Sequence, residues 1–256
     1  MKIAVCFSGQ IRTFDYCKES ILQFFPNCDF FCHTYDYTSY HEGPGLDDVE
    51  PTDITKNKIN LVKETLNPKS FKLTTREESE KLFKSFGWNG QENMINCYSM
   101  YYSICESLDN DFSEYDVVVK TRYDLIHTFR HTIEKFVPRK IQYLLSSEIP
   151  VRFFIDDLMD VKLENPEFPI NDVQWVFDTE TATLIKNYRD VFKKGPTEYP
   201  NNKHFMNYIL KNAESINLRK FRDYDMLLQS WQIVRPRHTK RESNWKSLIN
   251  NYKWIY

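Results

Sequence analysis

The feature that most constrains the fold is a strand–helix–strand pattern within the first 35 residues. Ile3 to Phe7 is a short apolar run that ends at Ser8-Gly9, as is typical of a strand buried on both faces. Asp15 to Phe25 has helical spacing and stops at Pro26, and its inner side is expected to hold Ile21, Leu22, Phe24 and Phe25. Cys28 to Tyr35 predicts the next strand. Strands joined in this way pair in parallel, so we expect an α/β fold.

The remaining chain alternates strand and helix in its first half and is more irregular in its second. Further strands are predicted over 70–74, 116–121, 141–145, 151–155 and 173–177. Helices are predicted over 58–66, 77–86, 89–108, 180–192 (capped by Asp178) and 204–213. Residues 36–56 are polar and predict a long loop, which in compact domains is usually functional or disordered. Because no linker divides the chain, residues 1–256 are predicted to form a single domain.

Charge and composition exclude several classes of protein. A net charge of −2 gives no overall attraction to nucleic acid, and the basic segment 235–241 is interpreted as a solvated loop. No run reaches the ~18 apolar residues of a membrane span, and the apolar start is too short for a signal peptide. We therefore expect no transmembrane segment and a cytoplasmic location. The six cysteines form no CxxC pair and are expected to be reduced thiols.

Glycine is scarce in this chain, which makes the position of each glycine informative. The 6 glycines contrast with 16 tyrosines and 19 phenylalanines, and the abundance of Asn, Lys and Ile suits an A/T-rich genome, as in some bacteria, phages and large viruses. Gly9 lies in the segment Ser8-Gly9-Gln10-Ile11-Arg12, directly after the first strand. Ligands of parallel sheets bind at the carboxyl ends of strands, and an arginine there can grip phosphate. The alternative is an ordinary tight turn with a surface arginine.

A second polar cluster follows the clearest strand of the chain. Asp116 to Thr121 leads directly into Arg122-Tyr123-Asp124. Burying a charge without a partner is costly, so Arg122 and Asp124 are expected to face a cleft, a metal or each other. The alternative is a structural ion pair at a strand end.

These two motifs together resemble GT-A-type glycosyltransferases of lipopolysaccharide, capsule and viral glycan synthesis. The resemblance implies a three-layer α/β/α sandwich with a mostly parallel sheet, a nucleotide-binding half at 1–130 and an acceptor-side half at 131–256. It also implies transfer of a sugar from a nucleoside-diphosphate sugar to a hydroxyl of a glycan or other acceptor. Asp124 matches the second acid of the family's Asp-x-Asp metal motif, where Arg122 replaces the first. Either Asp124 holds Mn²⁺ or Mg²⁺ with help from elsewhere, or Arg122 supplies the positive charge instead.

Three further segments supply candidates for nucleotide and acceptor contacts. Asn93 lies at the polar start of the helix 89–108, where free N–H groups suit phosphate, although simple capping explains it equally well. Tyr35 and Asp36 follow the second strand and are candidates for stacking on a base and for binding ribose hydroxyls. Asp172 precedes an aromatic strand and is our candidate general base, with Trp175 a candidate for stacking on a sugar; a cap and a core aromatic are the alternatives.

Other residues rank lower, and other functions remain open. The pair Asp156-Asp157 is a competing source of a metal carboxylate, and the isolated His204 and His238 are interpreted as structural or surface residues. The main alternative function is a nucleotide- or glycan-binding module without catalysis. A nucleotidyltransferase or methyltransferase is disfavoured because the chain has no Gly-rich loop.

The interpretation makes two demands on the structure. Arg12 and Asp124 must border one pocket, and Asp124 must not be closed off in an ion pair. Asp124→Ala is then expected to abolish transfer in a protein that stays folded.

Overall fold

A computed structural model gives the fold of a large part of the chain. It describes residues 1–40, 49–54, 56–87, 92–127, 153–155, 174–193, 205, 208, 211, 218–220 and 231–233. A seven-stranded sheet has the order β10-β8-β9-β6-β1-β2-β5. Its strands are β1 (Ile3–Phe7), β2 (Asp29–Tyr35), β5 (Ser70–Thr74), β6 (Val117–Thr121), β8 (Phe153–Ile155), β9 (Trp175–Phe177) and β10 (Leu218–Lys220).

The sheet is mostly parallel, which confirms the predicted fold class. β1 pairs in parallel with both β2 and β6, β2 with β5, and β8 with β10. β9 is antiparallel to β6 and to β8, so among the described strands of this sheet it alone runs in the opposite direction. Two small antiparallel pairs lie beside the sheet, β3 (Tyr37–Tyr40) with β4 (Val49–Asp53) and β7 (Leu125–His127) with β11 (Trp231–Ile233).

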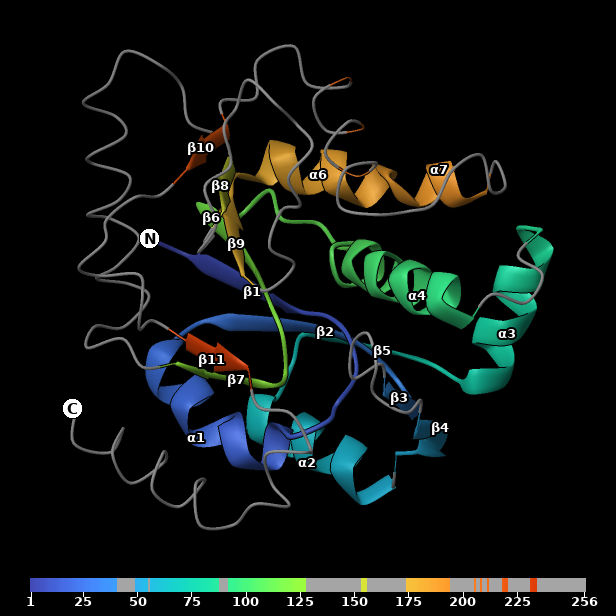
Figure 1. Cartoon of the computed structure of the whole chain (residues 1–256). Helices are drawn as coiled ribbons and strands as arrows, with labels where there is room; N and C mark the ends of the chain where they lie inside the picture. Colours follow the sequence, from blue (N-terminus) through green and yellow to red (C-terminus); the bar gives the residue numbers. More distant parts are fainter. Residues whose placement is uncertain are drawn as a thin grey trace.

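Helices cover both faces of the sheet and complete three layers (Figure 1). The helices are α1 (Phe14–Phe24), α2 (Lys56–Leu66), α3 (Arg76–Ser85), α4 (Glu92–Ser107), α6 (Thr179–Asn187) and α7 (Arg189–Phe192). Buried residues of α1 and α2 form one core with Val5, Phe7 and Val119. Buried residues of α3, α4 and α6 form a second core with Cys6 and Val118 on the other face. The alternation of inward directions along β1 and β6 therefore supplies both cores.

Local signals account for where several helices begin. Thr75 and Glu78 form a capping box at the start of α3, in which the Glu78 N–H donates to Thr75 Oγ1 (3.1 Å) and the Thr75 N–H donates to Glu78 Oε2 (2.8 Å). Asp178 caps α6 as predicted, since its carboxylate accepts the Thr181 N–H at 2.7 Å. None of the described helices is long and apolar enough to cross a membrane.

The structure corrects three expectations. The described part of residues 36–56 holds the antiparallel pair β3–β4 and the start of α2. Leu22 is 40% exposed, while Cys17 takes a core position on α1 instead. The helix predicted over 180–192 is divided at Tyr188 into α6 and α7.

The strand predicted at 141–145 lies outside the described residues, as does most of the helix predicted at 204–213.

Candidate functional site

The sheet has a topological switch point between β1 and β6. From β1 the chain passes through α1 to β2 on one side, whereas β6, on the other side of β1, is entered from α4. Figure 1 shows α1 and α4 on opposite faces of the sheet. Such a point opens a crevice outside the carboxyl ends of the two strands, where open α/β sheets bind ligands. Ser8 to Arg12 follows β1 and Arg122 to Asp124 follows β6, so both predicted motifs lie at the carboxyl ends of these two strands.

Two arginines meet one carboxylate at this edge. Arg122 donates from Nε to Asp124 Oδ1 and from Nη2 to Asp124 Oδ2, each at 2.8 Å, which is a bidentate ion pair. Arg12 Nη1 lies 3.9 Å from Asp124 Oδ2. The two arginine side chains are 16% and 15% exposed, and that of Asp124 is 2% exposed. Arg12 and Asp124 therefore lie at the same edge of the sheet, and that they border one pocket stays a prediction.

The second demand is not met, because Asp124 is enclosed by the ion pair. Burial by itself raises the pKa of this carboxyl, but the charge and hydrogen bonds of Arg122, together with the charge of Arg12, outweigh burial and hold the pKa below its ordinary value. Asp124 is thus a buried anion that two cations stabilise. An exposed catalytic acid does not fit this geometry.

The Gly9 turn is open on the side where a side chain would be. Gly9 has a φ of +102°, which favours glycine, and no atom of the described residues lies within 4 Å of the place a Cβ would take. In the same turn, Arg12 donates from Nε and Nη2 to Gln10 Oε1 at 3.2 and 3.1 Å, and Lys58 of α2 donates to the Arg12 carbonyl at 3.1 Å. Ser8 is tied to β6, since its N–H donates to the Thr121 carbonyl. The turn is therefore held on several sides, with open space beside its glycine.

A buried chain of hydrogen bonds, which the sequence did not reveal, anchors this turn to α4. The Gly9 N–H donates to Ser103 Oγ at 2.7 Å, and Ser103 Oγ is 2.7 Å from His33 Nδ1. His33 Nε2 lies 2.9 Å from Thr74 Oγ1 at the end of β5. Burial, with a smaller contribution from the charge of Lys72, lowers the pKa of His33 to about 3, so the imidazole is neutral. We call Gly9, Ser103, His33 and Thr74 the anchoring chain.

Two other predicted residues serve packing and capping. Tyr35 is 1% exposed, its hydroxyl donates to the Ser99 carbonyl at 2.7 Å, and the rings of His33 and Tyr37 pack against it. It cannot stack on a base in this arrangement, which corrects the prediction. Asp36 is half-buried and accepts the Arg76 N–H at 2.8 Å at the start of α3, and its role with ribose stays a prediction.

The candidates of the second half are described only in part. Asp172, Asp156, Asp157, His204 and His238 lie outside the described residues, and Asn93 lies in α4 with its side chain outside them. Trp175 is buried and stacks on Phe205 with ring centroids 5.3 Å apart, so the core alternative holds for this tryptophan. Its indole also contacts the buried Lys120 ammonium at 4.6 Å.

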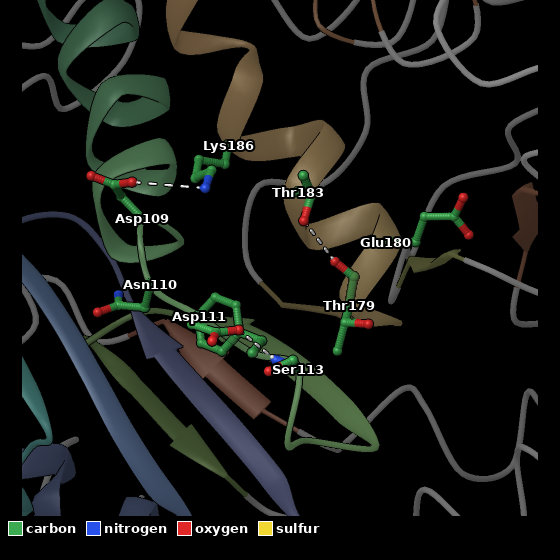
Figure 2. Close-up of a pocket in the computed structure, with 9 residues that line it drawn as sticks. Asp109, Asn110, Asp111, Ser113, Thr179, Glu180, Thr183 and Lys186 are labelled. Carbon is green, nitrogen blue, oxygen red and sulfur yellow. Dashed lines mark hydrogen bonds and ion pairs between the residues drawn. The ribbon is translucent and has the colours of Figure 1, made fainter.

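A surface hollow of about 630 Å³ lies elsewhere, between the end of α4 and the start of α6 (Figure 2). One part of its lining comes just before β6 and the other comes just after β9. Because β9 runs antiparallel to β6, both parts lie at the edge of the sheet opposite to Arg122 and Asp124. Asp109, Asp111 and Glu180 line it together with Lys186, which is 3.9 Å from Asp109. This excess of acids disfavours an anionic ligand, so the hollow does not suit a nucleotide.

The residues around Asp124 do not fit a divalent metal ion. Both carboxylate oxygens accept hydrogen bonds from Arg122, and two guanidinium groups border the position where a cation would bind. In the part of the chain that the structure describes, no three His, Cys, Asp or Glu side chains are grouped so that they could hold a metal.

Comparisons with known proteins find only distant likenesses. No protein-family model and no curated protein matches the chain. Among solved structures, the chain is similar to mouse xyloside xylosyltransferase 1 in its apo form (9% identity, TM-score 0.41, covering 86% of this chain and 84% of that one). It is also similar to the galactosyltransferase LgtC with donor and acceptor sugar analogues (12% identity, TM-score 0.40, covering 85% of this chain and 73% of that one). A third similar structure is 4-diphosphocytidyl-2C-methyl-D-erythritol synthase from Anaerococcus prevotii (9% identity, TM-score 0.38, covering 86% of this chain and 86% of that one). Likenesses this weak do not bear on the reaction.

Proposed function

We propose that the chain is a glycosyltransferase that moves a sugar from a nucleoside-diphosphate sugar to a hydroxyl of a glycan or other acceptor. The observation that carries the proposal is the meeting of Arg12, Arg122 and Asp124 at the switch point between β1 and β6. Among the residues that the structure describes, two positive charges and one negative charge meet at the strand ends where such sheets bind ligands. The open side of Gly9 next to them lets a ligand approach the backbone closely.

In this reaction the bond between the anomeric carbon and a diphosphate oxygen breaks, and its electron pair stays with that oxygen. The acceptor oxygen bonds to the carbon and gives its proton to a base, for which Asp172 stays our candidate. Negative charge grows on the leaving diphosphate, so fixed cations stabilise the transition state more than the bound substrate. Arg12 and Arg122 are the residues we assign to this task.

The alternative is a nucleotide- or glycan-binding module without turnover. The enzymatic interpretation demanded that Asp124 lie outside a closed ion pair, and the enclosed ion pair that the structure shows instead favours this alternative. The two functions share the anion-binding crevice and differ only in whether the donor is consumed.

The test is to incubate the purified chain with a panel of uridine, guanosine and cytidine sugar nucleotides, with and without glycan acceptors, and to measure the nucleotide released. We expect acceptor-dependent release from at least one donor. The double variant Arg122→Gln/Asp124→Asn should lower release roughly tenfold or more, as for the loss of a charge-assisted contact. Arg189→Gln is the matched control, because Arg189 is also paired with carboxylates, Glu106 at 2.8 Å and Asp109 at 3.2 Å, but lies on α7.

One result would contradict transfer, and another would contradict the role of the ion pair. Donor binding without release from any of the donors would establish the binding module. Equal release from the double variant and the unmodified chain would remove the ion pair from the mechanism.

A further inference from the structure

We infer that this site binds the diphosphate of its ligand through Arg12 and Arg122 without a divalent metal ion, and that Asp124 is a positioning residue that holds both guanidinium groups. The inference rests on the proposed function, because it concerns how the same site handles the same diphosphate. It resolves a choice that the sequence leaves open, namely whether Asp124 recruits a metal or Arg122 replaces it.

The charges around Asp124 favour an anion over a cation. Its carboxylate already has Arg122 at 2.8 Å on both oxygens and Arg12 at 3.9 Å on one. A divalent cation bound to either oxygen would lie beside two positive groups in a site that is largely shielded from water, where like charges repel strongly. An anion at the same place is attracted by both arginines. The charge of the site therefore favours diphosphate and opposes a metal.

Both arginines are held in place before a ligand binds. The forked contact with Asp124 sets the plane of the Arg122 guanidinium. Arg12 is held by the Gln10 amide oxygen, and its own carbonyl accepts from Lys58. Preorganised cations lose little conformational entropy on binding and need no rearrangement as charge develops. A buried carboxylate that aligns Arg122 and attracts the charge of Arg12 thus has a function that needs no metal.

The two arginine side chains are more accessible to a ligand than Asp124 is. Arg12 and Arg122 each retain exposure, unlike Asp124, so a ligand in the crevice meets the cations before it meets the acid. The open side of Gly9 belongs to the same turn as Arg12. A phosphate group that approaches this turn can therefore reach the arginines, whereas a metal ion would have to share both oxygens of Asp124 with Arg122.

The test is calorimetric titration of the full chain with uridine diphosphate, guanosine diphosphate and inorganic pyrophosphate, first with a chelator and then with Mn²⁺ or Mg²⁺. We expect at least one probe to bind in chelator, with a Kd that metal changes by less than about threefold, or less than about 0.7 kcal/mol. We also expect affinity to fall as salt is raised, since the attraction is between charges.

Variants separate a positioning role from a metal-binding role. Arg122→Gln/Asp124→Asn keeps a neutral hydrogen-bonding pair, so folding should survive while affinity in chelator falls roughly tenfold or more. Asp124→Glu keeps the charge and should retain more affinity than Asp124→Asn, under chelator and metal alike. Arg189→Gln should bind as the unmodified chain does.

The outcomes are distinguishable. Binding that chelator abolishes and Mn²⁺ restores overturns this inference and leaves the proposed function standing. A loss of metal response confined to the Asp124 variants also overturns it, because Asp124 would then be a metal ligand. Failure of all three probes to bind in either condition contradicts the proposed function, and the inference falls with it.

Discussion

At the scale of the single residue, Asp124 takes one of the alternatives that the sequence left open, an ion pair with Arg122. Its place after a Val-rich strand correctly indicated that it lies at the same edge of the sheet as Arg12. The sequence left open whether Arg122 and Asp124 face a cleft, a metal or each other, and the structure shows that they face each other, with Arg12 beside them. The pKa of Asp124 is held below its ordinary value by these cations, which makes the acid a counterion.

Asp124→Ala is consequently expected to destabilise the protein as well as to impair the site. The substitution leaves two partly buried arginines without their carboxylate, and breaking a buried ion pair by removing one partner costs about 3–5 kcal/mol. Urea unfolding followed by circular dichroism measures this free energy. Asp190→Ala is the control, since its ion pair with Lys193 is exposed and should cost no more than about 1 kcal/mol. If both substitutions cost equally little, the Asp124 ion pair does not stabilise the fold.

At the scale of elements, the sequence predicted best where one local rule decides the structure. β1 and β5 have the predicted bounds, because short apolar or alternating runs ended by polar residues have few alternatives. The hairpin β3–β4 was missed, since its residues Tyr37–Tyr40 and Val49–Asp53 are mostly polar and their pairing is a long-range contact. Leu22 was misplaced because the helix turns it away from the face that carries Cys17 and Ile21.

Of the candidate site, the sequence predicted only those residues that come directly after a strand. Gly9, Arg12 and Arg122 were found because each lies after a strand end, where parallel sheets bind ligands. The anchoring chain was not found, because His33, Thr74 and Ser103 come from three elements and no spacing connects them. Tyr35 was assigned to a base because an aromatic at a strand end gives no sign of which way it faces.

Ser103 of α4 provides a test of the anchoring chain. Ser103→Ala leaves the Gly9 N–H and a ring nitrogen of His33 without the hydroxyl that each contacts, and a buried polar group left unsatisfied costs about 1–3 kcal/mol. We expect lower stability in urea unfolding and weaker binding of pyrophosphate, because the Gly9 turn loses its anchor. Ser107→Ala is the matched control one turn along α4, where the buried hydroxyl contacts only the Ile104 carbonyl among the contacts described. Equal effects of the two variants would contradict an anchoring role.

At the scale of the whole molecule, the sheet separates two cores, and each contains a histidine that folding keeps neutral. His33 lies on the α4 side in the anchoring chain. His127 lies on the α1 side, stacked on Phe24 at 4.5 Å and edge-on to Phe25 at 5.0 Å. Burial lowers the pKa of each to about 3. Both histidines therefore stay unprotonated in the folded state and bind a proton more readily when the chain is unfolded.

This arrangement predicts a loss of stability in mild acid. An unfolded histidine titrates near pH 6.5, so between about pH 6.5 and about pH 3 the unfolded chain binds protons that the folded chain does not. The free energy of unfolding is then highest above pH 6.5 and falls as pH drops, by about 1.4 kcal/mol per pH unit for each histidine. His127→Phe keeps an aromatic ring against Phe24 and Phe25 but cannot bind a proton. Urea unfolding at a series of pH values should therefore give a shallower slope for the variant, by about one proton. Identical slopes would mean that His127 is protonated in the folded protein, and the tight ring packing on the α1 side would then have to accommodate a charge.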